Sequence, residues 1–296
     1  MKKATTTDEQ IEKIRSRGMF LDIGEEKTKE ILLDIGYFRL GFYCFPFEKT
    51  YPRLKNRTHE YKEGARISDV IRLYYLDFDL RHILIKYLNR IEIHFRTNIT
   101  YWASNEYREQ NNTWFADPTV MNKSFVSNFD DKIYNGIKEK NKVLKEHHSK
   151  YINDKYSPAW KTMEFLTFGA IINIYQNLKN EELKQKIANI YGIKSSKIFY
   201  NYISAIKDIR NVCAHGSVLF DFTLPLSLRK GPAFDYEKHS KNNLYSSILV
   251  IRYILSKISS NRATELDEKL NEIFYNYKEN SMISSVIENQ IGFKYP

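Results

Sequence analysis

The stretch from Ile67 to Tyr107 constrains the fold more than any other part of this sequence. Its apolar residues recur in steps of three and four, which is the period of a helix and not of a strand. The recurring positions are Leu80, Leu84, Leu88, Ile91, Phe95, Ile99 and Trp102. The pattern predicts either one long helix or two helices that break near Asp77–Asp79.

The rest of the chain fits the same fold class. Glycine (11) and proline (7) are scarce, which favours a mainly helical protein. We expect helices over residues 7–17, over 25–35 with turns at Gly36 and Gly41, and then over 122–156, 159–178, 180–192, 195–217, 242–259 and 263–277. Thr7 is the expected cap of the first helix, residues 218–240 read as irregular, and a short tail follows residue 277.

These elements predict an all-α protein, a helical bundle with an N-terminal helical extension. The expected division is residues 1–64 for the extension and 65–296 for the main helical domain, together forming one compact unit.

The charge and cysteine content narrow the function class. A net charge of +10 points to an anionic partner such as nucleic acid, although an A/T-rich genome also raises lysine usage. Cys44 and Cys213 form no C-x-x-C spacing, and no segment reads as a signal peptide or a membrane span. We expect a reduced cytoplasmic protein without a metal, a cofactor or a membrane partner.

The segment DIRNVCAHGS holds the order R-N-x-x-x-H in Arg210, Asn211 and His215. On a helix Asn211 and His215 share a face, and Arg210 lies about 7.5 Å along the axis from His215. Gly216 allows the helix to end directly after His215. On these residues alone, the motif can instead be a helix end at which arginine and histidine satisfy free carbonyl groups.

These side chains suit cleavage of RNA without a metal. His215 can accept the proton of a 2′-hydroxyl or protonate the leaving 5′-oxygen, and Arg210 can stabilise the charged phosphate. Asn211 can orient the imidazole or the phosphate. Because one histidine cannot easily be acid and base in one step, a second copy of the motif from a homodimer is expected to supply the other role.

Four stretches together resemble a known family. They are TTTDEQIEKIRSRGM, ILLDIGYFRLGFYCFPF, the long segment LYYLDFDLRHILIKYLNRIEIHFRTNITYWAS with WFADP after it, and IRNVCAHGS. Their order and spacing resemble the abortive-infection Abi family, the AbiD/AbiF-like phage-defence proteins, and the last stretch resembles the signature of HEPN domains.

The resemblance implies a HEPN-type helical fold, endoribonuclease activity, dimerisation and a toxin-like role, with a cognate small non-coding RNA that binds the protein. It places Arg210, Asn211 and His215 on the catalytic motif, and Glu92 and Arg96 on a supporting part of the long helix. The family often has a second histidine after the first, where this chain has Gly216.

Two interpretations are open for several candidate sites. Glu92 and Arg96 form either an exposed ion pair of little energetic value or a pair that packs against the motif helix and positions Arg210. Arg39 is an RNA contact, together with Tyr37 and Phe38, or a structural arginine among core aromatics. His147 and His148 are adjacent and do not have the spacing of a helical metal pair.

The basic segments are either RNA-binding surfaces or solvated lysines. The candidate RNA contacts there are Lys138, Lys140, Lys142 and Lys145 in the predicted basic helix, and Arg229 and Lys230 in the loop after the motif. The expected partner is RNA and not DNA. The alternative to the nuclease is a non-catalytic helical RNA-binding module that uses the same surface.

Overall fold

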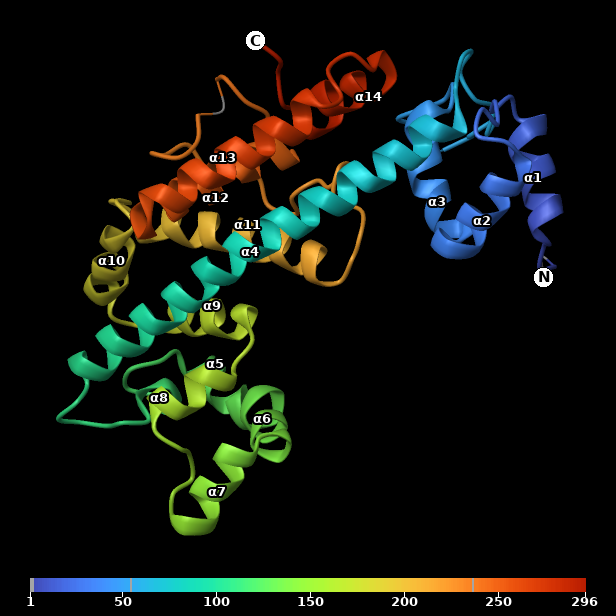
Figure 1. Ribbon diagram of the computed structural model, residues 1–296. Coiled ribbons are helices and arrows are strands. Elements are labelled where there is room, and N and C mark those ends of the chain that lie inside the picture. The colour runs from blue at the N-terminus through green and yellow to red at the C-terminus, as the bar shows by residue number, and fades with distance from the viewer. Residues whose placement is uncertain (1–2, 54, 236) are drawn as a thin grey trace. The chain divides into compact units, whose positions relative to one another are not determined.

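The computed structural model describes residues 3–53, 55–235 and 237–296, and it is built of helices (Figure 1). Within those residues there is no strand, only isolated bridge pairs. The predicted all-α class is therefore confirmed. The α-helices are α1 (Thr7–Ser16), α2 (Glu25–Ile35), α3 (Tyr37–Cys44), α4 (Ile67–Glu106), α5 (Lys123–Phe129), α6 (Asn135–Lys140), α7 (Lys142–Lys150), α8 (Ala159–Thr162), α9 (Phe168–Asn177), α10 (Glu181–Ile190), α11 (Ser196–Ala214), α12 (Leu244–Ile258), α13 (Ser260–Tyr275) and α14 (Ser281–Val286).

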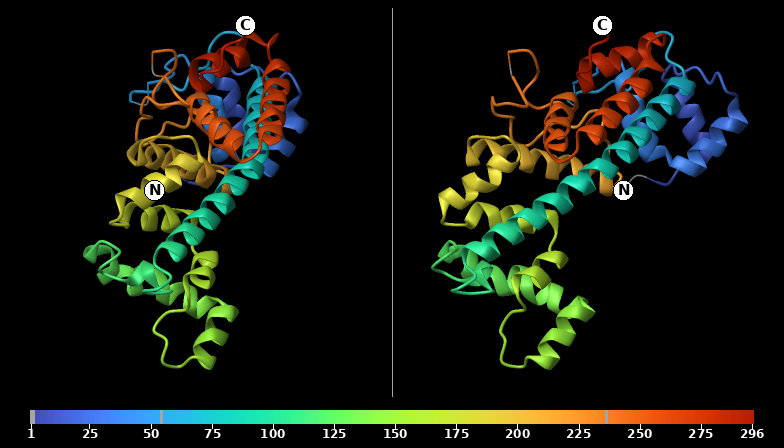
Figure 2. Two further views of the ribbon diagram at one scale, coloured as in Figure 1. Left: turned by 90° about the vertical axis from the view of Figure 1, so that its left-hand side faces the viewer. Right: turned by 60° about the vertical axis from the view of Figure 1, so that its left-hand side comes forward.

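The long segment forms one helix and not two. Helix α4 runs unbroken through 40 residues, as both views of Figure 2 show. The acidic residue at the predicted break, Asp77, is buried and pairs with Arg81 one turn further along the same helix. Because the Asp77 carboxylate pairs with a residue of the same helix, it does not interrupt α4. Six of the seven recurring apolar side chains are fully buried, and Trp102 is half-buried.

The chain divides into two units. One contains residues 1–83, 212–222 and 268–296, and the other contains residues 84–211 and 223–267. We call them the terminal unit and the central unit. Helices α4, α11 and α13 each contribute residues to both. The predicted division into residues 1–64 and 65–296 stays a prediction.

In the terminal unit, the first helices follow local sequence signals with two exceptions. Thr6, and not Thr7, caps α1, in a reciprocal capping box with Glu9. Gly36 has a φ of 89° and separates α2 from α3, as expected. Gly41 lies inside α3 and makes no turn, so that expectation was wrong.

The C-terminal tail of the terminal unit is also helical. Helix α14 follows its N-cap Asn280 and continues into a π-helical turn over Ile287–Ile291. Ile283, Ile287 and Ile291 are fully buried. Their spacing of four residues is a helical signal, although only a short tail was predicted after residue 277.

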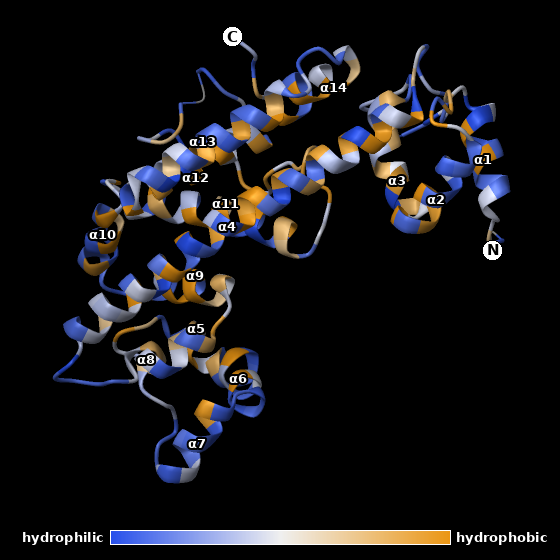
Figure 3. Ribbon diagram, viewed as in Figure 1, coloured by the Kyte–Doolittle hydropathy of each residue, from blue (hydrophilic) through white to orange (hydrophobic). Residues whose placement is uncertain are grey.

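In the central unit, the basic segment is not the single helix that was predicted. Helix α5 leads through a π-helical turn (Asp130–Tyr134) into α6, and the chain is extended at Asn141 before α7 begins. Asn141 causes the break because its side chain accepts a hydrogen bond from the Val143 amide and so caps α7. Figure 3 shows that α7 is mainly hydrophilic.

An aromatic cluster holds the motif helix in the central unit. Phe95 of α4 lies 5.6 Å from Phe199 of α11 and 5.7 Å from Tyr175 of α9, measured between ring centroids. Tyr191, directly after α10, stacks on Phe199 at 4.9 Å. These buried contacts fix α11 against α4 and thereby set which polar groups of the two helices can meet.

Candidate functional site

The R-N-x-x-x-H motif lies at the end of α11, which is one continuous helix from Ser196 to Ala214. The Ser217 amide donates to the Val212 carbonyl at 3.1 Å, and the Gly216 amide donates to the Cys213 carbonyl at 3.4 Å. Gly216 has a φ of 65°. This pattern is a Schellman ending, in which a left-handed glycine follows the last capping residue. His215 is therefore the C-cap, as the sequence indicated.

Arg210 is held by a buried carboxylate in the central unit. Its Nε lies 3.0 Å from Glu92 Oε2, and the Glu92 side chain is 9% exposed. Glu92 Oε1 also accepts from Arg96 Nη2 at 2.8 Å, and the same nitrogen donates to the Leu166 carbonyl at 3.0 Å. Glu92 thus joins two arginines and contacts the motif helix. This geometry favours the interpretation in which the pair positions Arg210 over that of an exposed ion pair.

Asn211 and His215 are both exposed. Arg210 Nη1 donates to Asn211 Oδ1 at 3.4 Å. Within the described residues the His215 side chain makes no hydrogen bond, and the residue is exposed. Arg210 and Asn211 are the last residues of segment 84–211 of the central unit, whereas His215 lies in the terminal unit.

In the terminal unit, the backbone that follows His215 is fixed by two arginines. Arg39 Nη2 donates to the Gly216 carbonyl at 2.5 Å, and Arg81 Nη1 donates to the Ser217 carbonyl at 3.1 Å. Arg39, one of the candidate RNA contacts, therefore binds the chain beside the motif. Its neighbour Phe38 is 82% exposed and is not a core aromatic.

The buried Asp77 completes this support. Its carboxylate accepts from Arg81, from the Tyr43 hydroxyl at 2.8 Å, and from the amides of Leu219 and Phe220 at 2.9 and 2.6 Å. Neither Asp77 nor Arg81 was among the site residues predicted from the sequence. A sequence signal for this pair exists. Asp77 and Arg81 are an acid and an arginine four residues apart on an apolar helix, which is the same pattern as Glu92 and Arg96.

The other candidate RNA contacts are not brought together on one element. Lys138 and Lys140 lie on α6, whereas Lys142 and Lys145 lie on α7 beyond the break. Arg229 and Lys230 are exposed in the loop after the motif, and Lys230 pairs with Glu237 at 2.9 Å. Whether any of them binds RNA stays a prediction.

Cys213 of the motif and His147 of α7 are both held in protein surroundings. Burial raises the pKa of the Cys213 thiol to about 12, which keeps it protonated and weakly nucleophilic. His147 is buried beside Asp154, with 3.3 Å between Nε2 and Oδ2. In the described part of the chain, no three histidine, cysteine or acidic side chains converge as metal ligands would.

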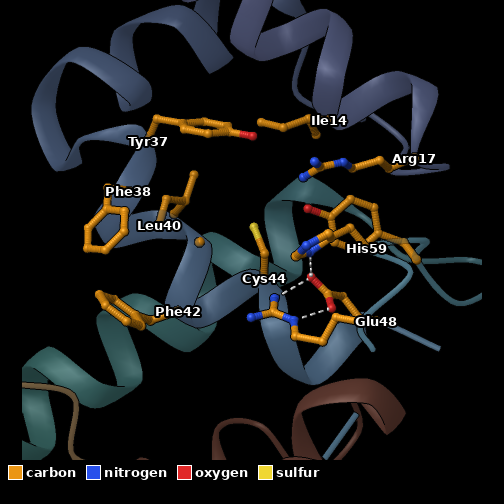
Figure 4. Close-up of a pocket in the computed structure, with 12 residues that line it drawn as sticks. Ile14, Arg17, Tyr37, Phe38, Leu40, Phe42, Cys44, Glu48 and His59 are labelled. Atoms are coloured by element: carbon orange, nitrogen blue, oxygen red, sulfur yellow. Dashed lines mark hydrogen bonds and ion pairs between the residues drawn. The ribbon is translucent and has the colours of Figure 1, made fainter. Parts of the chain in front are cut away.

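The terminal unit also contains a cavity of about 190 Å³ between α1, α3 and the loop before α4 (Figure 4). The buried Glu48 lies in its wall and accepts two hydrogen bonds from Arg57, at 2.9 and 2.6 Å. His59 Nδ1 lies 3.2 Å from the same carboxylate. Burial acts to raise the pKa of Glu48, but the hydrogen bonds from Arg57 and His59 outweigh it and hold that pKa below its usual value.

Replacing Glu48 by glutamine is expected to lower the free energy of unfolding by about 1–3 kcal/mol at pH 7. A carboxyl with a lowered folded pKa stabilises the fold above its unfolded pKa, and the contribution is lost as the pH falls through the folded value. The difference between the two proteins should therefore shrink below the ordinary glutamate pKa of about 4.3. Urea unfolding followed by circular dichroism at several pH values measures it.

The matched control is Glu60→Gln, because the Glu60 side chain is 59% exposed in its pair with Lys49. That variant should unfold like the wild type at every pH. A Glu48→Gln difference that stays constant from pH 7 to pH 3 would contradict the role assigned to the carboxylate.

Three comparisons relate the chain to known proteins. A family model described as Abi-like protein matches residues 30–221, which is more than half of the chain and includes α4 and the whole motif. No curated protein and no solved structure gave a match. Separately, in the described residues, no helix combines the length and apolarity needed to cross a bilayer. On the family match, this chain belongs to the family of Abi-like proteins.

Proposed function

We propose that this protein is a metal-independent endoribonuclease that acts in phage defence by abortive infection. The observation that carries the proposal is the end of α11, where Arg210 and Asn211 occupy the last turn and His215 is the exposed C-cap. Membership of the Abi-like family supports the defence role.

The reaction that suits these side chains is transfer within the RNA strand. The 2′-oxygen forms a bond to the adjacent phosphorus, and the bond from phosphorus to the 5′-oxygen breaks. A base takes the 2′-hydroxyl proton and an acid protonates the leaving 5′-oxygen. The products carry a 2′,3′-cyclic phosphate and a 5′-hydroxyl.

The roles follow from the groups present. His215 serves as the base or the acid, and the same residue of a second protomer in a homodimer serves in the other role. Arg210 binds the phosphate and stabilises the charge that develops on it. Asn211 orients the reacting groups. Glu92 accepts a hydrogen bond from Arg96 and forms an ion pair with Arg210, and we assign it to hold Arg210 in place rather than to react.

A cognate small non-coding RNA is the proposed regulator, on the family resemblance. The net charge of +10 supports an RNA partner, whether substrate or regulator.

The test is cleavage of end-labelled RNA in EDTA by protein freed of nucleic acid. The expected result is cleavage that leaves 2′,3′-cyclic phosphate ends, and no cleavage by an Arg210→Ala/His215→Ala double variant from the same purification. Wild-type protein that binds RNA but cleaves none of a broad RNA set would support the non-catalytic RNA-binding module instead.

A further inference from the structure

Two adjoining cavities lie in the central unit, on α5, α6, α9 and the π-helical turn Asp130–Tyr134. The larger has a volume of about 410 Å³ and the smaller about 270 Å³. Lys132 and Ile133, both in the π-helical turn, line the two cavities and so form a shared wall. Such a turn is rare in proteins and is frequent at functional sites.

The larger cavity combines apolar walls with positive charge. Its apolar lining comes from Ile133, Ile137, Phe165, Leu166 and Ala170. Lys132 and Lys140 also line it, and within the described residues neither lysine forms an ion pair. Apolar walls suit a nucleobase, and unneutralised lysines suit the phosphates on either side of it.

The smaller cavity offers a different kind of contact. Its polar lining includes Asn128, Asn173 and Asn177. The Asn128 amide nitrogen donates to the Ser124 carbonyl, and that of Asn177 donates to Asn173, so the Asn128 side-chain oxygen and the Asn173 amide nitrogen are the groups that can pair with a base edge. Phe125 and Phe129 supply its apolar part. An apolar, basic pocket beside an amide-lined pocket matches two consecutive nucleotides whose bases are unstacked.

The larger cavity is also linked to the motif arginine inside the same unit. Leu166 lines the cavity, and its carbonyl accepts from Arg96, which pairs with Glu92, which pairs with Arg210. The start of α9 also lies close to α11, because a Cβ on Gly169 would be 3.8 Å from Cδ of Lys207 on α11. A strand held in the cavities would therefore run close to the helix that carries Arg210.

We propose that these two cavities bind consecutive unpaired nucleotides of single-stranded RNA, next to the phosphate that Arg210 engages. This rests on the proposed function, because it takes RNA as the substrate. It adds a substrate-binding site on α5, α6 and α9 that selects unpaired RNA, since bases in a duplex are not available to enter either cavity.

Gly136 of α6 gives a direct test, because it lines the larger cavity and a Cβ there would meet no atom within 4 Å. Gly136→Phe should fill the cavity without straining the helix, in which glycine is a poor residue. We expect the affinity for a labelled, unstructured RNA to fall about tenfold or more. Binding is measured by fluorescence anisotropy in a His215→Ala background, so that the RNA stays intact.

The matched control is Asn135→Phe, which adds the same ring to an exposed position of α6 that does not line either cavity. It should bind RNA like the parent protein. Melting curves for both variants establish that each is folded, and Lys140→Ala provides a test that adds no bulk.

Lys140→Ala should weaken binding and reduce the slope of log affinity against log salt by about one, because one phosphate contact is lost. Lys194→Ala removes an exposed lysine outside the cavities and should leave that slope unchanged. A merely structural role for Lys140 would not alter the slope.

The outcomes separate this inference from the nuclease. If the wild type cleaves RNA and Gly136→Phe binds it as tightly as Asn135→Phe, the cavities are not the RNA site and the nuclease stands. If no RNA is cleaved but Gly136→Phe alone loses binding, the cavities are the site and the nuclease is wrong. Absence of RNA cleavage by the wild type, together with absence of RNA binding by the parent protein, overturns both.

Discussion

Replacing His215 by alanine is expected to lower the rate of RNA cleavage by about 10²- to 10⁴-fold and to leave the fold unchanged. The large effect follows from the role of the imidazole as proton donor or acceptor in the reaction. The small structural effect follows from its place, because His215 is exposed at the C-cap of α11 and makes no hydrogen bond to any described residue. Single-turnover cleavage of end-labelled RNA in EDTA measures the rate.

His82→Ala is the matched control for that experiment. His82 is also an exposed histidine at a helical position, and its Nδ1 lies 2.8 Å from the carbonyl of Phe78 on the same helix. Its loss should not change the rate. Equal rates for the wild type and His215→Ala would show that the imidazole takes no part, and the cleavage would then need another explanation.

Replacing Asp77 by alanine is expected to lower the free energy of unfolding by about 3–5 kcal/mol. The substitution leaves the buried Arg81 without its carboxylate partner, and it removes the acceptor of the Leu219 and Phe220 amides. A buried charge and two buried donors without partners are each costly. Urea unfolding followed by circular dichroism measures the loss.

Hydrogen exchange locates the effect of the same substitution. The amides of Leu219 and Phe220 should exchange faster in Asp77→Ala, because they lose their acceptor. Asp79→Ala is the control, since Asp79 lies two residues further along α4 and is exposed. If the Asp77 and Asp79 variants were equally stable and equally protected, the carboxylate would not hold the chain after the motif.

Helix α4 supports Arg210 of the motif and the chain directly after the motif in the same way. Glu92 contacts Arg210 in the central unit, and Asp77 and Arg81 fix residues 217–220 in the terminal unit. Each support is an acid and an arginine four residues apart on α4. The long helix therefore contributes polar support within each unit, in addition to its apolar core face.

The sequence by itself determined the features that depend on neighbours along the chain. Helical spacing from Leu80 to Trp102 predicted α4, and Gly216 predicted the end of α11 directly after His215. Apolar periodicity, capping and glycine conformation act over a few residues, so they can be read from sequence alone. The motif itself, and the resemblance to the Abi family that the family match bears out, were also evident at this level.

Only the tertiary structure decided which polar groups meet. The sequence left open whether α4 breaks near Asp77, but α4 is continuous there, and the Asp77 carboxylate accepts from backbone amides more than 140 residues away. Asn141 interrupts the predicted basic helix because it caps α7. Glu92 contacts Arg210 because Phe95 of α4 packs on Phe199 of α11. Such pairings depend on how apolar faces pack across the fold, and no local pattern of residues specifies the distant partner.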